Sequence, residues 1–281
     1  MEYQEIYRQG VSVLEKAGIE EASLDARLLL EEACGTDRTA LYAHGDRELT
    51  GEQERQYLQK LELRAKRIPL QHILGKTEFM GLTFLVNKDV LCPRPDTEVL
   101  VEEVLKHLHD GMRILDIGTG SGCILLSLLH YSNDCQGVGA DISGKALQTA
   151  RENAKRLSIE QVCFVESDLF EKIEGKFEII VSNPPYIRSG DIEGLMPEVR
   201  DHDPRAALDG GADGLFFYRE ITRRAKEHLH GGGMLFYEIG YDQGEAVRRI
   251  MEDNGFREVE AIKDFSGLDR VVFGTLYASG H

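Results

Sequence analysis

The sequence predicts an α/β protein with a mainly parallel sheet, preceded by a small helical domain. From residue 113 onward, short apolar segments alternate with helical segments, which is typical of a parallel sheet with helices on both faces. Before residue 68, apolar residues recur only at helical spacing, without strand-like alternation. The 281 residues suffice for two such domains, and 42% hydrophobic residues can bury a substantial core.

Residues 1–68 are expected to form several short helices. Ser23 and Thr50 each precede a helical segment, and both are predicted N-caps because a side-chain hydroxyl can accept a hydrogen bond from a first-turn N–H. Gln53 stands at the capping-box position relative to Thr50.

Pro69 and Gly75 interrupt this helical pattern. Between residues 77 and 92, apolar residues flank Gly81, which predicts a β-hairpin between two domains. We therefore divide the chain into a helical domain (1–68), a linker with a β-hairpin (69–92) and a large α/β domain (93–281).

The large domain is expected to alternate strands and helices in order. The predicted strands are 113–117, 137–141, 162–166, 177–182, 234–239 and 271–277. The predicted helices are 121–131, 144–157, 215–230 and 244–254. Ligands of such sheets bind beyond the carboxyl ends of the strands. One rim is therefore expected to carry Gly118, Asp141, Asp168, Asn183 and Glu238.

Composition excludes several classes of protein. No apolar run reaches the about 18 residues needed to cross a bilayer, and the N-terminus lacks signal features, so we expect a cytoplasmic protein without membrane contact. The five cysteines include no C-x-x-C pair, which favours free thiols over disulfides or a zinc site. A net charge of −16 disfavours direct binding of nucleic acid.

The segment 114–123 is expected to form a strand, a Gly-rich turn and the start of a helix. Its glycines, Gly118, Gly120 and Gly122, follow G-x-G-x-G rather than the dinucleotide fingerprint, and no Gly-Lys-Ser/Thr follows them. A pyrophosphate cradle and a Walker loop are both disfavoured. Asp141, at the end of the next strand, can accept hydrogen bonds from two ribose hydroxyls, which predicts an adenosine ligand.

The tetrapeptide Asn183-Pro184-Pro185-Tyr186 directly follows the strand 177–182. Each Pro lacks an N–H and fixes φ, so the sheet cannot continue and backbone carbonyls point elsewhere. A side-chain carbonyl and a main-chain carbonyl held together can accept both hydrogens of a planar –NH2 group, while a Tyr ring covers its face. Taken alone, the tetrapeptide fits a Pro-terminated strand and a turn equally well.

Together, the loop, the acidic strand end and this tetrapeptide resemble class I methyltransferases, whose fourth strand carries (D/N/S)-P-P-(Y/F/W). The resemblance implies a Rossmann-like seven-stranded sheet, with S-adenosyl-L-methionine as cofactor and S-adenosyl-L-homocysteine as product. Implied cofactor-binding residues are Gly118, Thr119, Gly120, Ser121, Gly122, Asp141, Asp168, Leu169, Phe170 and Asn183. Asp168, with Leu169 or Phe170 beside it, is expected to border the adenine. Because the chain has no Trp, the side chain that covers the ring stays open.

The whole chain resembles the PrmC/HemK protein-glutamine methyltransferases, which modify peptide chain release factors. The matching motifs are Pro69–Gly75, Pro93–Glu98, Asp116–Gly122, Ser182–Ile187, Asp203–Leu208, Gly210–Gly214 and Glu238–Tyr241. The resemblance implies N5-methylation of the glutamine in the Gly-Gly-Gln loop, a step tied to translation termination. It also implies that the helical domain recognises the release factor.

This chemistry agrees with the residues present. We expect the Asn183 side-chain oxygen and the Pro184 carbonyl to accept one amide hydrogen each, which aims the nitrogen at the methyl group from about 3–3.5 Å. Tyr186 would cover the amide plane, and no dedicated base is required. Asn183, Pro184 and Tyr186 are thus the predicted catalytic residues. Pro185 and Arg94 complete the predicted substrate site; Arg94 or Glu98 is placed near cofactor or substrate, and Asp96 is a candidate helix cap.

Three rival interpretations remain. A ribosomal-protein glutamine methyltransferase shares the tetrapeptide and loop. An amino-group methyltransferase of DNA or RNA acts on the same planar –NH2, although the acidity opposes it. A non-catalytic cofactor-binding protein is disfavoured by the intact Asn183 with both prolines. No metal is expected: Asp201-His202-Asp203 precedes Pro204 and lacks a nearby fourth ligand, so we interpret it as a loop lining the substrate entrance.

Overall fold

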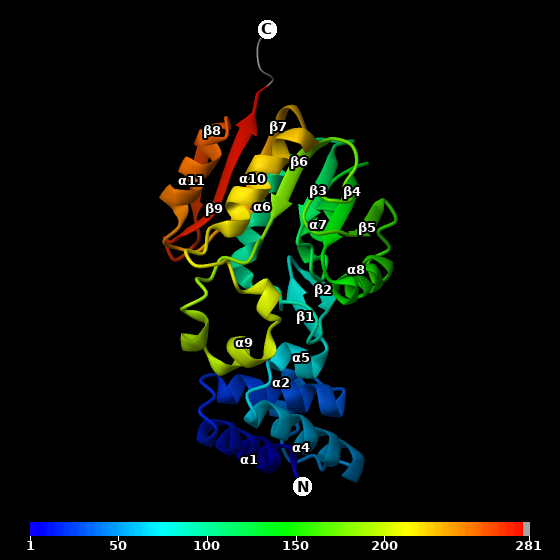
Figure 1. Cartoon of the computed structure of the whole chain (residues 1–281). Helices are drawn as coiled ribbons and strands as arrows, with labels where there is room; N and C mark the ends of the chain where they lie inside the picture. The colour runs from blue at the N-terminus through cyan, green and yellow to red at the C-terminus, as the bar shows by residue number, and fades with distance from the viewer. Residues whose placement is uncertain (278–281) are drawn as a thin grey trace. The chain divides into compact units, whose positions relative to one another are not determined.

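The computed structural model describes residues 1–277 and divides into two compact units (Figure 1). The first unit contains Met1–Gly75 together with Met196–His202, and the second contains the other described residues. Nothing in the sequence pattern had indicated that residues 196–202 pack with the N-terminal helices. The limits expected for the helical domain, the linker and the large domain stay a prediction, and residues 278–281 lie outside the described part of the chain.

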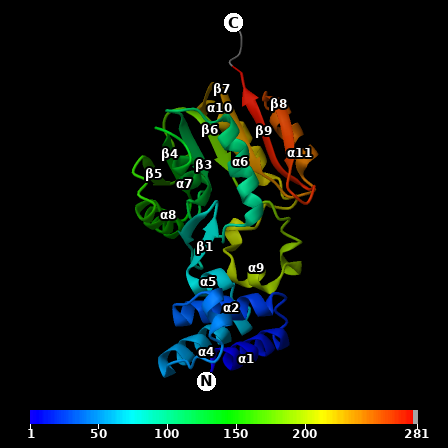
Figure 2. The ribbon, with the colours of Figure 1, turned by 180° about the vertical axis from the view of Figure 1, so that it is seen from behind.

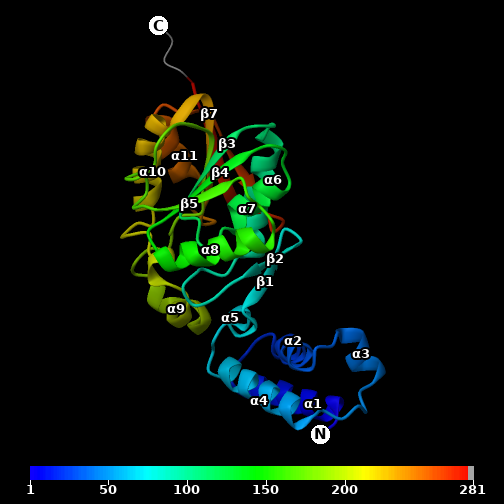
Figure 3. The same ribbon diagram turned by 90° about the vertical axis from the view of Figure 1, so that its right-hand side faces the viewer.

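The first unit is helical. Its helices are α1 (Tyr3–Lys16), α2 (Ala22–Cys34), α3 (Arg38–Ala43), α4 (Gly51–Ala65), α5 (Leu70–Leu74) and α9 (Pro197–His202). Helices α1, α2 and α4 lie side by side (Figure 3). Their facing sides bury one apolar cluster that includes Ile6, Leu14, Leu29, Tyr57 and Leu61. The helical spacing seen in the sequence is the pattern of this buried face.

One of the two predicted N-caps is confirmed. The Thr50 hydroxyl accepts from Gln53 N at 3.2 Å, and Gln53 Oε1 accepts from Thr50 N at 3.0 Å, a complete capping box. The prediction for Ser23 is wrong, because α2 begins one residue before it, at Ala22, with Glu21 in the cap position and no side-chain cap.

The predicted β-hairpin is present in the second unit. Strands β1 (Lys76–Phe79) and β2 (Leu82–Leu85) pair antiparallel, with Phe79 opposite Leu82. The two turn residues, Met80 and Gly81, have φ of 52° and 70°, as a tight primed turn requires. Phe79 and Phe84 pack edge to face with ring centroids 6.1 Å apart, and both belong to the core of the larger sheet.

The second unit is built around a seven-stranded sheet with the order β5-β4-β3-β6-β7-β9-β8. Pairs from β5 to β7 are parallel, and β9 runs antiparallel to β7 and β8. The strands are β3 (Arg113–Ile117), β4 (Gln136–Asp141), β5 (Val162–Glu166), β6 (Phe177–Ser182), β7 (Leu229–Glu238), β8 (Arg257–Lys263) and β9 (Asp269–Leu276). The expected mainly parallel, seven-stranded class I fold is confirmed.

Helices cover both faces of this sheet. They are α6 (Glu98–His107), α7 (Cys123–His130), α8 (Gly144–Arg156), α10 (Phe216–His228) and α11 (Gly244–Asp253). Alternate residues of each strand face opposite sides. Ile114, Ile179 and Phe236 pack in the core of α6, α7 and α8, the face seen in Figure 2. Leu115, Ile180 and Leu235 pack in the core of α10 and α11.

Two elements of the second unit lacked a clear sequence signal. Strand β8 lies at the edge of the sheet and buries only Val259 among its seven residues, so it shows no apolar run. Helix α6 follows a short 3₁₀ turn at Pro95–Thr97, and Asp96 caps neither element: its carboxylate pairs with Arg270 at 3.2 Å. Two further 3₁₀ turns span Ile192–Gly194 and Arg205–Ala207.

Within residues 1–277, no helix combines the length and the apolar character that a bilayer crossing requires.

Candidate active site

A cavity of about 570 Å³ opens at the carboxyl edge of strands β3 to β6. Eight residues singled out from the sequence line it: Gly118, Gly120, Asp141, Asp168, Leu169, Asn183, Pro184 and Pro185. They come from the ends of four neighbouring parallel strands, whose carboxyl ends meet at one edge. The sheet therefore brings the Gly-rich loop and the Pro-containing tetrapeptide to a single cavity.

The Gly-rich loop is tied to strand β4 through backbone bonds. The N–H groups of Gly118 and Thr119 donate to the Ala140 carbonyl at 2.8 and 3.0 Å. Gly118 and Gly120 have φ of 75° and 55°, a left-handed conformation that favours glycine. Without Cβ atoms, these two residues let a ligand approach the backbone closely.

Asp141, the last residue of β4, is held by two backbone donors. Its Oδ2 accepts from Gly120 N and its Oδ1 accepts from Ser143 N, both at 2.9 Å. Burial raises the pKa of Asp141, and these donors oppose the shift. Each carboxylate oxygen has a second lone pair, so the side chain can still accept hydrogen bonds from a ligand.

Three implied cofactor residues do not line the cavity. The Thr119 hydroxyl donates to Asp116 Oδ2 at 2.7 Å, and Ser121 is buried. Gly122 takes the cap position of α7. Complete burial raises the pKa of Asp116 to about 7, although the Thr119 hydrogen bond lowers it in part. Thr119, Ser121 and Gly122 therefore support the conformation of the Gly-rich loop.

At the end of β5, Asp168 and Leu169 line the cavity but Phe170 does not. Phe170 is buried in the α10 side of the core, and its ring stacks on His228 with centroids 4.8 Å apart. Of the two side chains expected beside the adenine, the structure brings only Leu169 to the cavity. Ile142, directly after Asp141, also lines the cavity and leaves 63% of its surface exposed.

The tetrapeptide leaves the sheet immediately after β6. Asn183 Nδ2 donates to the Thr97 hydroxyl at 3.5 Å, so the amide NH2 of Asn183 points toward the start of α6. Tyr186 is half-buried, with its hydroxyl 3.5 Å from Glu238 Oε1. Its backbone carbonyl accepts from Gln243 Nε2 at 3.0 Å.

Glu238, the last residue of β7, lies behind this tetrapeptide and is 2% exposed. Burial raises its pKa to about 7, and hydrogen bonds from Thr97 and Asn183 together with the charge of Arg270 act in the opposite direction. Its Oε2 atom has no partner at strict hydrogen-bond geometry among the described residues. The sequence placed Glu238 on the rim, but gave no sign of this polar contact with Asn183.

Comparisons with known proteins give matches along most of the chain. A family model described as "PrmC N-terminal domain" matches residues 5–75, and one described as "Methyltransferase small domain" matches residues 94–197. A protein of Geobacter sulfurreducens, named release factor glutamine methyltransferase, is 45% identical over 264 residues, which are 94% of this chain and 93% of that protein. The chain belongs to the release factor glutamine methyltransferase family. The family inferred from the sequence motifs is thus confirmed, and with it a methyltransferase activity.

Other relatives support the same family and fold. A release factor glutamine methyltransferase of Caulobacter vibrioides is 45% identical over 265 residues, covering 93% of this chain and 92% of that protein. A 16S rRNA methyltransferase of T. thermophilus, solved in complex with AdoMet and guanosine, is 18% identical with a TM-score of 0.51. That match covers 72% of this chain and 49% of that one, and it shows a shared fold.

The segment before α6 is held by ion pairs. Arg94 Nη2 lies 2.8 Å from Asp203 Oδ2, and the Arg94 side chain is 42% exposed. Glu98 instead accepts from Met80 N at 2.6 Å and anchors the hairpin turn. Arg94 does not line the cavity, but its side chain is partly exposed and lies close enough to Tyr186 to lower the pKa of that hydroxyl in part, whereas Glu98 is engaged in the fold.

Sequence reasoning missed two aromatic residues of the cavity. Phe216 and Phe217, at the start of α10, line it together with Ile142, and Phe216 is 49% exposed. Exposed apolar side chains of this size next to a polar rim are typical of a ligand site. For Ile142, the available sequence signal was its position as an apolar residue directly after the acidic strand end at Asp141.

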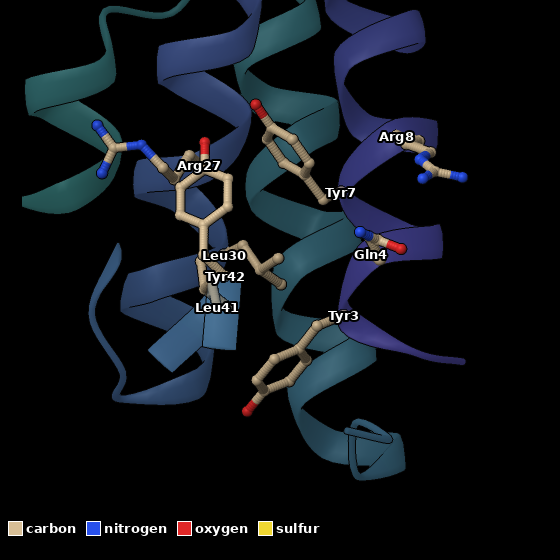
Figure 4. A pocket seen from close by; sticks show the side chains of 8 residues that line it. All are labelled: Tyr3, Gln4, Tyr7, Arg8, Arg27, Leu30, Leu41 and Tyr42. Carbon is tan, nitrogen blue, oxygen red and sulfur yellow. The ribbon is translucent and has the colours of Figure 1, made fainter. Parts of the chain in front are cut away.

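The helical unit contains a separate, smaller cavity of about 140 Å³ (Figure 4). It lies among the N-terminal helices and is lined by Tyr3, Gln4, Tyr7, Arg8, Arg27, Leu30, Leu41 and Tyr42. Tyr42 is 68% exposed, and the Arg38 guanidinium lies 5.7 Å from its ring centroid. Tyr and Arg dominate the energetic centres of protein interfaces.

Proposed function

We propose that this enzyme transfers the methyl group of S-adenosyl-L-methionine to the side-chain amide nitrogen of the glutamine in the Gly-Gly-Gln motif of a peptide chain release factor. One observation carries the proposal: Asn183-Pro184-Pro185 lines the same cavity as Gly118, Gly120 and Asp141. Donor and acceptor parts of a methyl transfer can therefore meet there. The names of the curated relatives supply the acceptor.

The cavity residues fit S-adenosyl-L-methionine. Gly118 and Gly120 offer a backbone surface without Cβ atoms, and Asp141 retains acceptor lone pairs for ribose hydroxyls. Leu169 and Ile142 line the cavity and offer apolar surface for the adenine ring. They take this role because the chain has no Trp. When bound, the cofactor supplies an electrophilic methyl group on a sulfonium.

The tetrapeptide is suited to hold a primary amide. Asn183 directs its NH2 group to Thr97, which leaves Oδ1 as an acceptor for one amide hydrogen of the substrate. The Pro184 carbonyl accepts the second hydrogen, and the half-buried Tyr186 ring covers the amide plane. Arg94, exposed beside the loop, contacts the acceptor backbone.

Orientation is the main contribution of these residues. An amide nitrogen is a poor nucleophile because its lone pair is delocalised into the carbonyl, so fixed acceptors must aim it at the methyl carbon. A nitrogen–carbon bond forms, the sulfur–carbon bond breaks, and one N–H proton leaves after the transfer. The mechanism assigns no general base.

We further propose that residues 1–68 recognise the release factor. The match of residues 5–75 to the family's N-terminal domain supports this role, and so does the Tyr- and Arg-lined cavity of Figure 4. A bulky apolar or aromatic side chain of the release factor would enter it. Replacement of the exposed Tyr42 by Ala is then expected to raise KM for the release factor about tenfold and to leave KM for S-adenosyl-L-methionine unchanged.

One experiment tests the proposed reaction. The enzyme is incubated with methyl-labelled S-adenosyl-L-methionine and, in turn, a release factor, a ribosomal protein fraction and nucleic acid. Label is expected in the release factor alone. Asn183→Ala should lower the rate about a hundredfold, since a misplaced nucleophile costs this much, whereas Asn133→Ala, on an exposed loop, should not.

The acceptor side provides a second arm of this test. A release factor with Glu in place of the target Gln offers no amide hydrogens, and such mismatches reach about 10⁴-fold discrimination. Equal labelling of the Gln and Glu forms would overturn the proposed role of the tetrapeptide. Label in ribosomal protein or nucleic acid would overturn the assigned acceptor.

A further inference from the structure

A buried polar pair lies behind Asn183, outside the cavity lining. Thr97, at the junction of the 3₁₀ turn and α6, is 2% exposed, and so is Glu238 at the end of β7. Burial of polar groups is costly unless they are hydrogen-bonded. We call these two residues the Thr97–Glu238 pair; neither touches the cavity, yet both contact the side chain proposed to hold the substrate.

The pair fixes which end of the Asn183 amide faces inward. Asn183 Nδ2 lies 3.5 Å from Thr97 Oγ1, and both side chains lie close enough to the buried Glu238 carboxylate to lower its pKa in part, against the effect of burial. A carboxylate can only accept hydrogen bonds. The NH2 end of Asn183 therefore belongs on the buried side, where the Thr97 hydroxyl accepts from it and the Glu238 carboxylate lies nearby.

The opposite orientation would destroy the site proposed for the substrate amide. Rotation of the Asn183 amide by 180° exchanges Oδ1 and Nδ2 with almost no change in shape, so packing alone does not select one orientation. With Oδ1 toward the cavity, the side chain accepts a hydrogen from a substrate –NH2. With Nδ2 toward the cavity, two donors would face each other, and a carboxylate would bind better than an amide.

We propose that Thr97 and Glu238 are positioning residues that hold the Asn183 amide with its oxygen toward the acceptor and so select a glutamine amide over a carboxylate. This inference rests on the proposed function, because it assigns the origin of acceptor selectivity within the same site. The pair acts on the substrate only through Asn183.

The charge of Glu238 controls the strength of this restraint. Charged and titratable groups face it from several elements: Asp96 before α6, Tyr186 after β6, and Arg270 on β9, while the Tyr218 hydroxyl of α10 donates to its backbone carbonyl at 2.9 Å. Burial dominates and raises the pKa of Glu238 to about 7. Below this pH, the protonated carboxyl can donate to Asn183 Oδ1 and permit the wrong orientation.

A first comparison removes only the hydroxyl. Thr97→Val preserves the shape of the side chain but removes the hydroxyl that accepts from Asn183 Nδ2, so kcat for the release factor should fall about tenfold. Thr97→Ser retains the hydroxyl and should keep activity within about threefold. The dissociation constant for S-adenosyl-L-homocysteine should be unchanged in both variants, because Thr97 does not line the cavity.

A second comparison removes the charge. Glu238→Gln can pair with either end of the Asn183 amide, so kcat should fall about tenfold and the Gln-over-Glu acceptor preference should shrink. The rise of kcat with pH through about 7 should also disappear. Because the pair acts through Asn183, Glu238→Gln should have no further effect in the Asn183→Ala background.

A readout independent of catalysis keeps this inference separate from the proposed function. The side-chain NH2 resonances of Asn183, assigned by their loss in Asn183→Ala, should shift with pH near 7 in the wild type and stay constant in Glu238→Gln. The positioning role would be overturned if the Asn183 resonances did not shift with pH near 7. It would also be overturned if the effects of Glu238→Gln and Asn183→Ala on kcat were additive. A wild-type enzyme that labels no release factor would instead overturn the proposed function.

Discussion

Arg64 and Glu198 form a buried ion pair, with Nη2 and Oε1 3.0 Å apart, although 134 positions separate them in the chain. Arg64 also binds Asp25 at 2.6 Å, and Glu198 also binds Arg67 at 2.8 Å. These bonds join Met196–His202 to the N-terminal helices in one compact unit. The chain that leaves the tetrapeptide Asn183–Tyr186 thus contributes to the helical unit before it returns to the sheet.

Loss of the Arg64 guanidinium should destabilise the helical unit strongly. Arg64→Ala leaves the buried carboxylate of Asp25 without its cation and Glu198 with Arg67 alone, and breaking a buried pair in this way costs about 3–5 kcal/mol. Lys66→Ala is the matched control, because the side chains of its pair with Glu62 are 63% and 68% exposed and the pair should contribute little to stability. Urea denaturation of both variants measures the difference; similar free energies of unfolding would contradict it.

Gly10 should not tolerate a methyl group. A Cβ at this position, in the middle of α1, would lie 1.8 Å from the Tyr57 hydroxyl oxygen. Gly10→Ala should therefore lower the free energy of unfolding by about 1–3 kcal/mol, which outweighs the gain of up to about 1 kcal/mol in helix propensity.

Two further variants isolate this clash. Tyr57→Phe removes the overlapping oxygen, whose buried hydroxyl has no partner within the described structure, and should recover part of the loss in the Gly10→Ala background. Gly51→Ala has no atom within 4 Å of its Cβ and should be neutral or stabilising. Thermal unfolding that shows Gly10→Ala to be as stable as Gly51→Ala would disprove the close contact.

The sequence predicted those parts of the fold that depend on local pattern. Strands β3 and β6 have the expected limits because they are mostly buried apolar runs bounded by turns, and the edge strand β5 has the expected limits because four of its five residues are apolar although none is buried. Strand β8 was missed because an edge strand needs little apolar surface, and the partner of Arg64 was missed because ion pairs between distant segments leave no periodic signal.

In the candidate site, too, the positions at strand ends could be predicted from the sequence, whereas the contacts between distant segments could not. Gly118, Asp141 and Asn183 could be placed on one rim, because parallel strands end at one edge and each residue directly follows or ends a strand. The contacts of Thr97 and Glu238 with Asn183 could not be predicted, since they require β6 and β7 to be neighbours and α6 to begin beside them.

Gly210 should be essential for the position of the tetrapeptide. A Cβ there would lie 2.7 Å from the Pro185 carbonyl oxygen and 2.8 Å from Tyr186 Cα. These are backbone atoms that cannot rotate away, so Gly210→Ala must displace the loop that holds the acceptor. A displacement of the acceptor site by about 1 Å lowers the rate about a hundredfold, so we expect kcat for the release factor to fall by this factor. The affinity for S-adenosyl-L-homocysteine should change little.

Gly190→Ala is the control for this prediction. Gly190 lies in the same connection after the tetrapeptide, but its Cβ would meet no atom within 4 Å. Its kcat should stay within about twofold of the wild type, because the loop need not move. Equal activity of the two variants, measured with labelled S-adenosyl-L-methionine, would show that the tetrapeptide tolerates displacement.

The Glu238→Gln variant should be more stable than the wild-type enzyme above neutral pH, although it should be less active. In the folded state burial raises the pKa of Glu238 from 4.5 to about 7, so the folded state binds this proton more tightly than the unfolded state does. Wild-type stability from this group is therefore complete below about pH 4.5 and is lost as the pH rises to about 7, a total of about 3 kcal/mol.

Because Gln carries no charge, the free energy of unfolding of Glu238→Gln relative to wild type should increase from pH 5 to pH 8 and then level off. The buried Asp116 titrates in both proteins, so its contribution cancels in the difference. Glu160→Gln, at an exposed position, controls for the substitution itself. If the difference in free energy of unfolding between Glu238→Gln and wild type does not change with pH, the prediction that Glu238 titrates as a buried group is wrong. A variant that is more stable at pH 8 yet slower in methyl transfer would show that its lost activity does not come from unfolding.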